Sequence, residues 1–470
     1  MKEHAFKHLF VQATYAFTGT LLGRLSAAAA GIVMARSLQA EMFGVYSTLW
    51  ELTLLCGSFT ETGMTVGVQR DGASDHTKLG LLFGNAFLVR LLIGFPALVI
   101  AYFFSARMAG GISYNAIYIA LSLASAAVFL SEPMYSVLQV LGKQKNIAIV
   151  ESLRGFITLI GIVILVIFKR GIVEMAWLQG VVYAGMFFVL ARSTLPCIQV
   201  EVNLRSALSQ FKTSFIFGVS TLVFSIYSRV PILLLSYLQG PVAVGYYAAA
   251  YRIISMVYVV GAGVYQRAFL PSLFGYYKKN LTEFQSASNF MQQYFVVFGF
   301  FCAIGLFVGA DTIIVVLMGK SYYAGVSIMR ILSVSVFINF MLYAADATLT
   351  AGNQNYAKIY IQIIGTVVGA AGGYFFIQYF GAKGAAFTDI LIRAVQMVLF
   401  FALVYKLRYM SFKPIIRLAV PFILILLISL VLVKIMPHAY IMRPIFALVI
   451  VTPVLIYLIG LKKIRSLISR

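Results

Sequence analysis

Residues 38–50 read LQAEMFGVYSTLW, and residues 238–251 read LQGPVAVGYYAAAY. Setting Gly44 over Gly245 aligns GVYSTLWE with GYYAAAYR at an offset of 245 − 44 = 201 residues. The alignment also sets Glu51 over Arg252, so the first copy has an acid where the second has a base. We interpret the two phrases as copies of one duplicated segment.

A second pair of segments repeats at a similar spacing. LQVLGKQKNIAIVESLRG, residues 138–155, aligns with TLTAGNQNYAKIYIQIIG, residues 348–365, at an offset of 365 − 155 = 210 residues. Without a gap, the same offset brings Gly171 onto Gly381. This shared register makes duplication a better interpretation than chance similarity.

Both offsets approximate the length of six membrane-spanning helices. We therefore predict two six-helix lobes, residues 1–200 and 201–410, followed by two additional helices in residues 411–470. Because six is an even number, the second lobe enters the membrane in the same orientation as the first. Parallel repeats of this kind are typical of transporters.

The composition is that of a polytopic membrane protein. Of the 470 residues, 61% are hydrophobic and only 11% are charged, which excludes a soluble globular chain. The predicted fold class is therefore all-α, with about fourteen spans of the length that a hydrocarbon core requires. The spans begin near Tyr15, Phe43, Leu79, Ser113, Ile147, Ile172, Thr213, Val242, Ser288, Gly325, Ala357, Ala382, Pro414 and Ile441.

The net charge of +22 follows from membrane topology rather than from nucleic-acid binding. With the amino terminus inside, most Lys and Arg residues outside the spans fall in cytoplasmic segments. The outer loops keep only Arg36, Arg107, Lys169, Arg170, Lys320, Lys383, Lys434 and Arg443. We therefore expect both termini in the cytoplasm and no nucleic-acid partner.

The sequence offers no pattern for a metal site, a disulfide framework or ATP hydrolysis. The three cysteines, Cys56, Cys197 and Cys302, lack the spacing of metal ligands, and the four histidines lie in tails or loops. No Walker motif is present. We expect no cofactor and no enzymatic activity.

Several charged residues lie within the predicted spans, where each must face protein or water. Glu151 and Arg154 are three residues apart, and Asp389 and Arg393 are four apart, so each pair shares a helix face. We predict local ion pairs for these four.

Arg90 and Arg330 lie a turn or two inside the starts of their helices. For both we favour a position in which the long side chain reaches back to the lipid headgroups.

Arg24, Arg229 and Arg252 have no acid at helical spacing. Small residues surround Arg24 and Arg252 on their helix faces, as on a cavity wall or a close helix contact. A guanidinium in that setting can bind a phosphate bidentately, so the three arginines are our candidate substrate-binding residues. An alternative of about equal weight is a salt bridge between Arg252 and Glu51.

Glu51 and Glu61 are the candidates for ion coupling or for a gate, because an intramembrane acid can exchange protons during a transport cycle. Two glycine series, Gly19 with Gly23 and Gly365 with Gly369 and Gly373, have GxxxG spacing. We interpret these glycines as helix contacts rather than as ligand loops.

The doubled phrase, the LGKQKN and AGNQNYAK turns and the parallel lobes resemble one transporter family. This is the polysaccharide-transporter branch of the multidrug/oligosaccharidyl-lipid/polysaccharide exporter superfamily, which includes the O-antigen and capsule flippases. The resemblance covers about residues 8–405. It implies a V-shaped two-lobed fold in a bacterial or archaeal cytoplasmic membrane.

The resemblance also implies a function. The substrate would be an undecaprenyl-pyrophosphate-linked oligosaccharide, flipped to the outer leaflet by alternating access that an ion gradient or the membrane potential drives. Membrane lipids, polysaccharide polymerase and chain-length proteins are the implied partners. The resemblance further implies essential arginines in the first and eighth helices, where this chain has Arg24 and Arg252. The related flippases also use an arginine in the second helix, where this chain has Glu51.

Two other functions are weighed against the flippase. A multidrug or cation antiporter of the same superfamily would prefer an acidic, aromatic cavity, which the unpaired Arg24, Arg229 and Arg252 disfavour. A membrane polysaccharide polymerase or ligase would resemble its class in having a large outer loop. The longest connections here, residues 192–212 and 271–287, are predicted on the inner side.

Overall fold

The computed structural model describes residues 2–109 and 114–411, and the regular structure of this part is entirely helical. Eleven of the described helices are long and apolar enough to cross a membrane. Every predicted span up to residue 406 corresponds to one of these helices or to half of the first. The all-α, polytopic fold class is therefore confirmed, and the helices predicted from Pro414 and Ile441 lie outside the described residues.

The chain divides into two compact units. The first comprises residues 1–248 with 377–382, and the second comprises residues 249–376 with 383–470. The lobes at 1–200 and 201–410 stay a prediction, because a division by spatial contact does not report where a sequence repeat begins.

The first unit contains seven α-helices and the start of an eighth. These are α1 (Lys2–Ser58), α2 (Met64–Ser74), α3 (Leu79–Met108), α4 (Asn115–Val140), α5 (Gln144–Ile167), α6 (Ile172–Thr194), α7 (Leu204–Gln239) and α8 (Pro241–Val264). Short 3₁₀ turns, η1 (His76–Lys78) and η2 (Leu195–Cys197), precede α3 and follow α6.

The second unit contains the rest of α8 and nearly all of the elements that follow it. These are the π-helical turn η3 (Tyr265–Phe269), α9 (Leu270–Lys279), α10 (Leu281–Leu317), the 3₁₀ turn η4 (Lys320–Tyr322), α11 (Gly325–Ala351), α12 (Asn355–Phe380) and α13 (Ala382–Lys406). The turn between α12 and α13 belongs to the first unit.

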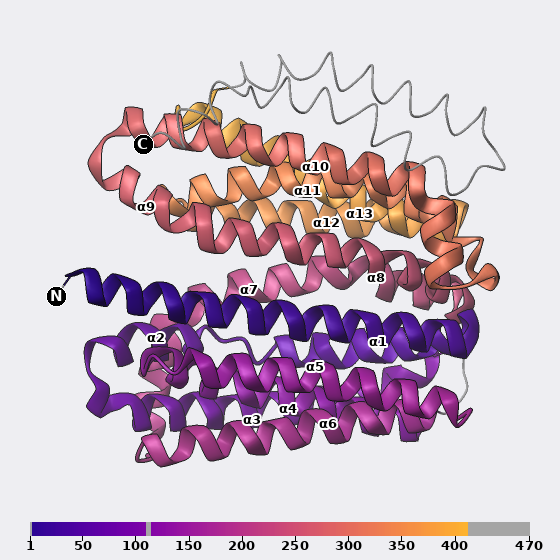
Figure 1. Ribbon diagram of the computed structural model, residues 1–470, viewed down its shortest axis with the longest axis horizontal. Coiled ribbons are helices and arrows are strands. Elements are labelled where there is room, and N and C mark those ends of the chain that lie inside the picture. The colour runs from indigo at the N-terminus through magenta and orange to yellow at the C-terminus, as the bar shows by residue number, and fades with distance from the viewer. Residues whose placement is uncertain (1, 110–113, 412–470) are drawn as a thin grey trace. The chain divides into compact units, whose positions relative to one another are not determined.

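Helix α1 consists of two segments joined at a single residue. Gln39 has φ 61° and ψ 173°, which no helix can contain. The chain therefore crosses the unit, turns at Gln39 and returns (Figure 1). This turn separates the spans predicted near Tyr15 and Phe43.

The order of long and short helices repeats along the chain. In the first half the short α2 lies between α1 and α3, and in the second half the short α9 lies between α8 and α10. Four long helices complete the first half, α3 to α6, and four complete the second, α10 to α13. The described helices thus support the duplication inferred from the two phrases.

The two copies of the doubled phrase contact each other within the first unit. A Cβ on Gly44 would lie 1.8 Å from the carbonyl oxygen of Pro241, and a Cβ on Gly245 would lie 1.8 Å from that of Ala40. At the offset of 201, Ala40 is itself the equivalent of Pro241. The contact is therefore isologous, as at a two-fold axis, and only glycine allows the backbones to approach so closely.

At the second repeat, the structure corrects the alignment by one residue. The left-handed residue that ends the helix is Gly142 (φ 69°) after α4 and Asn353 (φ 59°) after α11. In each case the next amide donates to the carbonyl five residues earlier, at 2.8 Å. The turns are equivalent at an offset of 353 − 142 = 211 rather than 210, because Asn can replace Gly at a left-handed helix end.

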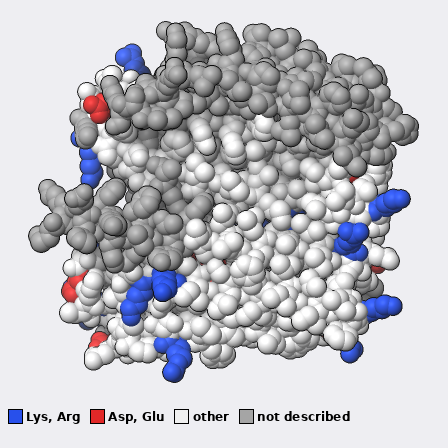
Figure 2. Space-filling model, viewed as in Figure 1, with Lys and Arg blue, Asp and Glu red and all other residues white. Residues whose placement is uncertain are grey.

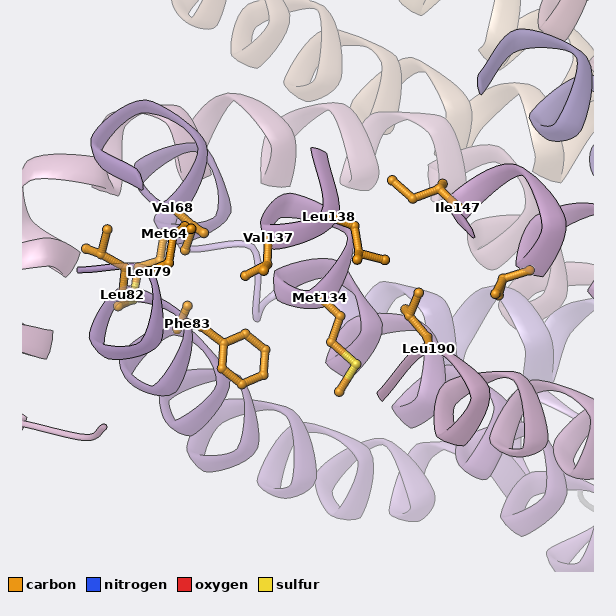
Figure 3. Close-up of a cluster of buried hydrophobic side chains, with 12 residues drawn as sticks. Met64, Val68, Leu79, Leu82, Phe83, Met134, Val137, Leu138, Ile147 and Leu190 are labelled. Carbon is orange, nitrogen blue, oxygen red and sulfur yellow. The ribbon is translucent and has the colours of Figure 1, made fainter. Parts of the chain in front are cut away.

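A cluster of buried apolar side chains holds α2 against its neighbours in the first unit (Figure 3). Met64 and Val68 of α2 belong to the same cluster as Phe83 of α3, Val137 of α4 and Leu190 of α6. All five are at most 3% exposed. This cluster thereby positions the connection between α1 and α2, which contains Glu61.

The described surface has the charge pattern of a membrane protein. On the face drawn in Figure 2, Lys and Arg side chains lie toward the helix ends, and the belt between them is almost entirely uncharged. Large apolar side chains on this part of the chain are freely exposed, such as Phe103 at 75% and Ile167 at 69%. Such exposure is stable only against lipid or another apolar partner.

Candidate functional site

Glu51 and Arg229 form an ion pair inside the first unit. Nε of Arg229, on α7, lies 3.1 Å from Oε2 of Glu51, on the returning segment of α1. Arg229 also donates from a terminal nitrogen to the carbonyl oxygen of Ser225, at 2.9 Å. Because the two side chains are 18% and 29% exposed, the pair is only partly shielded. Helical spacing could not reveal this partner, since Glu51 and Arg229 come from different helices.

Hydroxyl groups also connect α1 and α7 by hydrogen bonds near the Glu51–Arg229 pair. Thr48 of α1 donates to Oγ of Ser236 on α7 at 3.1 Å, and Ser236 donates to the carbonyl oxygen of Met108 at 2.6 Å. The Glu51–Arg229 pair is therefore part of a longer polar contact between α1 and α7.

Arg24 lies next to a close contact between α1 and α5, but its own side chain is not part of that contact. A Cβ on the preceding residue, Gly23, would lie 2.3 Å from the carbonyl oxygen of Glu151, so this face of α1 packs directly on α5. Arg24 itself is exposed, and its side chain has no ion pair or hydrogen bond with a described residue.

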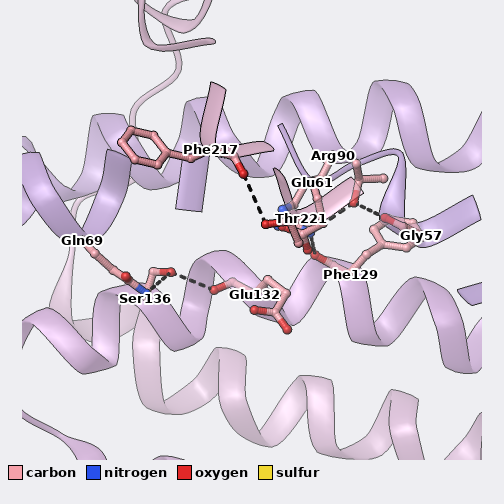
Figure 4. A network of polar contacts seen from close by, with 10 residues as sticks. Gly57, Glu61, Gln69, Arg90, Phe129, Glu132, Ser136, Phe217 and Thr221 are labelled. Atoms are coloured by element: carbon pink, nitrogen blue, oxygen red, sulfur yellow. Dashed lines mark hydrogen bonds and ion pairs between the residues drawn. The ribbon is translucent and has the colours of Figure 1, made fainter. Parts of the chain in front are cut away.

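Arg90 is buried rather than extended toward the headgroups, so the headgroup prediction was wrong. The side chain is 2% exposed and forms an ion pair with Glu61 at 2.9 Å (Figure 4). Its guanidinium also donates to Oγ1 of Thr60 at 3.1 Å and to the carbonyl oxygen of Phe129 at 2.9 Å. A buried guanidinium needs such partners, and the turn after α1 supplies two of them.

Glu61 is thus engaged with a structural arginine. Its backbone is fixed as well, because a Cβ on Gly218 of α7 would lie 2.4 Å from the carbonyl oxygen of Glu61. By contrast, the half-buried carboxylate of Glu132, on α4, has no hydrogen bond or ion pair with a described residue. Figure 4 shows Glu132 near the Arg90 network.

Both local pairs predicted from helical spacing are confirmed. Arg154 pairs with Glu151 on α5, and its guanidinium stands 4.8 Å above the ring of Tyr183. In the second unit, Arg393 pairs with Asp389 on α13 at 2.9 Å, with both side chains at most 6% exposed.

The Arg393 pair belongs to a wider polar core of the second unit. Arg393 also donates to Oδ1 of Asn339 on α11, and its guanidinium lies 4.8 Å from the ring centre of Tyr258 on α8. The Tyr258 hydroxyl lies 2.8 Å from Oγ of Ser335. These bonds satisfy the buried guanidinium, which indicates a structural role.

Two further ion pairs of the second unit were not predicted from the sequence. Asp311 of α10, 5% exposed, pairs with Arg330 of α11, so the predicted headgroup position of Arg330 was also wrong. Asp346 pairs with Lys358 at 2.6 Å and accepts from the Tyr265 hydroxyl. Asp311 could have been noticed as a lone charge within an apolar run, but its partner is on another helix.

Arg252 differs from its neighbours in the second unit. It is half-buried on α8, and its side chain has no ion pair or hydrogen bond within the described part of the chain. Of the three candidate arginines, Arg229 has an acidic partner, whereas Arg24 and Arg252 have none within the described residues.

Both glycine series are helix contacts, as predicted. Gly19 and Gly23 pack on α5, where a Cβ on Gly19 would lie 2.4 Å from Cβ of Ala148. Gly365, Gly369 and Gly373 of α12 pack on side chains of α13. Within the described residues, no group of three His, Cys, Asp or Glu side chains could hold a metal ion.

The sequence profile of a family described as "polysaccharide biosynthesis protein" matches residues 33–327, more than half of the chain. The chain belongs to this family. The matched range includes the doubled phrase, Glu51, Glu61, Arg229 and Arg252, and it begins after Arg24. No curated protein matches this polysaccharide biosynthesis protein in sequence.

Solved structures share the fold. A structure of the lipid II flippase MurJ in an inward closed conformation is 13% identical, with a TM-score of 0.72, and the match covers 95% of this chain and 99% of that one. A point mutant of the Vibrio cholerae MATE transporter VcmN is 12% identical, with a TM-score of 0.59 over 85% of this chain and 98% of that one. A transporter of the superfamily from Pyrococcus furiosus is 14% identical, with a TM-score of 0.60 over 85% and 95%.

Family and fold together confirm the resemblance to the polysaccharide-transporter branch of the superfamily. They also agree with a multi-pass membrane protein. At these identities, the likeness to the solved structures concerns the fold and not the substrate.

Proposed function

We propose that the protein is a flippase for a lipid-linked oligosaccharide. It moves an undecaprenyl-pyrophosphate-linked glycan from the cytoplasmic to the outer leaflet, for O-antigen, capsule or another surface polysaccharide. The family supports a role in polysaccharide biosynthesis, and the fold is shared with a lipid II flippase. The proposed location is a bacterial or archaeal cytoplasmic membrane with both termini inside, and polymerase and chain-length proteins are the proposed partners.

The observation that carries this proposal is that two guanidinium groups on membrane-spanning helices have no partner within the described residues. Arg24 and Arg252 have no acid among the described residues. An intramembrane charge without a partner is costly, so such a group is retained for a ligand of opposite charge. A pyrophosphate suits arginine, because its oxygens accept bidentate hydrogen bonds.

We propose that Arg229 also binds the pyrophosphate in one state of the transport cycle and that Glu51 acts as a gate. In the structure Glu51 occupies one side of the Arg229 guanidinium. An arriving pyrophosphate would compete with Glu51 for Arg229, so binding of the substrate would loosen the contact between α1 and α7. Glu61, whose carboxylate is paired with the buried Arg90, is proposed to take part in ion coupling only if that pair opens.

A cellular transport assay tests the proposal. In a strain that depends on this protein for export, Arg252→Ala and Arg24→Ala should cause lipid-linked oligosaccharide to accumulate in the cytoplasmic leaflet. Arg252→Lys should restore little, because an ammonium lacks the bidentate fork. The matched control is Arg170→Gln, since Arg170 is an exposed arginine whose side chain has no described partner. Export at the wild-type level by Arg252→Ala cells would overturn the assignment.

A multidrug or cation antiporter is the second candidate, because MATE transporters share the fold. The half-buried Glu132 favours it, as the carboxylate is without a described partner. Glu51, Glu61 and Glu151 are already paired with arginines, which reduces the negative charge available to a cationic drug. Proton-driven uptake of an organic cation into proteoliposomes, lost in Glu132→Gln, would favour this alternative. A membrane polymerase or ligase is the weakest candidate, because the family and the fold are those of transporters.

A further inference from the structure

An apolar groove opens on the first unit between α1, α3 and α7. Its volume is about 700 Å³. Leu52 and Leu55 of α1, Ala97 and Phe104 of α3, and Leu233 of α7 are among the residues that line it. All of them belong to helices that are long and apolar enough to cross a membrane.

The groove follows one face of α3. Ile93, Ala97, Ile100 and Phe104 line it at helical spacing, and Arg107 ends the row. From Ile93 to Arg107 the helix rises about 21 Å, most of the thickness of a hydrocarbon core. The small Ala97 leaves a hollow between larger side chains that face outward, such as Ile100 at 60% and Phe104 at 59% exposure. A surface of this length and composition fits an extended hydrocarbon chain.

One end of the groove has a cation. The Arg107 guanidinium lies 4.8 Å from the ring centre of Tyr237 and donates to the Tyr237 hydroxyl at 2.9 Å. Arg107 is exposed and has no acidic partner in the described part of the chain. The ring and the hydroxyl hold the guanidinium at the mouth without neutralising its charge.

We propose that this groove is a binding site for a bilayer phospholipid with a net negative headgroup. One hydrocarbon chain lies along α3, and the phosphate accepts hydrogen bonds from Arg107. The groove opens on exposed apolar side chains of membrane helices, so its occupant comes from the bilayer. A single uncompensated guanidinium matches one phosphodiester, whereas a pyrophosphate would need more donors than this mouth provides. This site does not depend on the proposed transport function.

Competition between lipids tests the headgroup. The purified full-length protein is equilibrated in mixed micelles with equal amounts of phosphatidylglycerol and phosphatidylcholine, and retained lipids are counted by native mass spectrometry. Wild type should retain phosphatidylglycerol about fivefold better, the contribution of one basic residue near an anionic headgroup. Arg107→Gln should bring the ratio close to one, whereas Arg170→Gln should leave it unchanged. A wild-type ratio in Arg107→Gln would overturn the proposal.

A second variant tests the groove itself. Ala97→Phe should fill the hollow and abolish retention of both lipids, whereas Val99→Phe, on an exposed α3 position outside the groove, should not. Thermal unfolding midpoints of both variants in lipid-free detergent check that they remain folded. If Ala97→Phe unfolds, a photoreactive acyl chain on phosphatidylglycerol replaces it and should label residues 93–104 of the wild type. Labelling elsewhere, or a polyprenyl pyrophosphate as the lipid retained from native membranes, would contradict the proposal.

Discussion

Gln39 and Gly240 hold the same backbone conformation at equivalent positions of the two repeats. Gln39 has φ 61° and ψ 173°, and Gly240 has φ 77° and ψ −174°, at an offset of 240 − 39 = 201 residues. Each residue ends one membrane helix and starts the next. Glycine adopts this region freely, whereas a residue with a Cβ is strained there. The first copy of the turn is therefore strained and the second is not.

Gln39→Gly should raise the thermal unfolding midpoint. Relief of the strain is worth roughly 1–3 kcal/mol, and the extra freedom of glycine in the unfolded chain offsets roughly 0.5–1 kcal/mol of it. We expect a net gain of about 1 kcal/mol, because the exposed Gln39 side chain loses little packing. The reciprocal variant is Gly240→Ala, where a Cβ meets nothing within 4 Å and only the backbone changes. It should lower the midpoint, and a rise there would refute the strain argument.

Gly44→Ala should destabilise the protein, because its Cβ would meet a backbone carbonyl that has no flexible end to move. Overpacking of this kind costs about 1–3 kcal/mol, and the two helices must separate to relieve it. Gly185→Ala is the matched control, since Gly185 also lies inside a helix and a Cβ there meets nothing within 4 Å. The control should be neutral or slightly stabilising. Equal midpoints for the two variants, measured in one detergent, would refute the close contact.

Arg90→Met should lower the stability by about 3–5 kcal/mol, because the partly buried Glu61 carboxylate would lose the guanidinium that binds it. The double variant Arg90→Met, Glu61→Gln removes both charges and should recover most of the loss. Chemical unfolding in detergent measures both effects. If the double variant is no more stable than Arg90→Met alone, the ion pair is not what holds Arg90 in place.

Glu51 and Arg229 should be coupled energetically. In a double-mutant cycle with Glu51→Gln and Arg229→Gln, we expect an interaction free energy of about 0.5–3 kcal/mol in the unfolding free energy. Glu51→Gln should retain binding of a lipid-linked pyrophosphate, whereas Arg229→Gln should weaken it. Additive effects on unfolding would show that the 3.1 Å contact contributes nothing.

The positions of the membrane helices could be predicted from the sequence, because each needs its own apolar run of a length that the bilayer sets. The ion pairs Glu151–Arg154 and Asp389–Arg393 were also predictable, since helical spacing fixes which side chains meet within one helix. The same spacing identified the glycine faces of α1 and α12. All of these features are local in the chain.

What the sequence could not reveal are pairings between helices. Arg90 and Arg330 were expected to reach the headgroups, but Glu61 and Asp311 compensate them on adjacent elements. The partner of Arg229, Glu51, is 178 residues away along the chain. Such partners depend on how helices pack, which periodicity does not specify. The equivalence of Gly142 and Asn353 was missed for another reason. A sequence alignment matches residue identity, whereas a turn selects backbone conformation.

The reciprocal contact of Gly44 with Pro241 and of Gly245 with Ala40 has an evolutionary consequence. A surface that matches its own copy through a two-fold axis is the surface of a homodimer. A half-length ancestor, carrying the phrase once, would have met a second molecule of itself through this glycine. Gene fusion would have freed the two halves to diverge, and position 51 of the first half and position 252 of the second now have opposite charges. The present chain would in this sense correspond to a fused homodimer whose two halves have diverged in sequence.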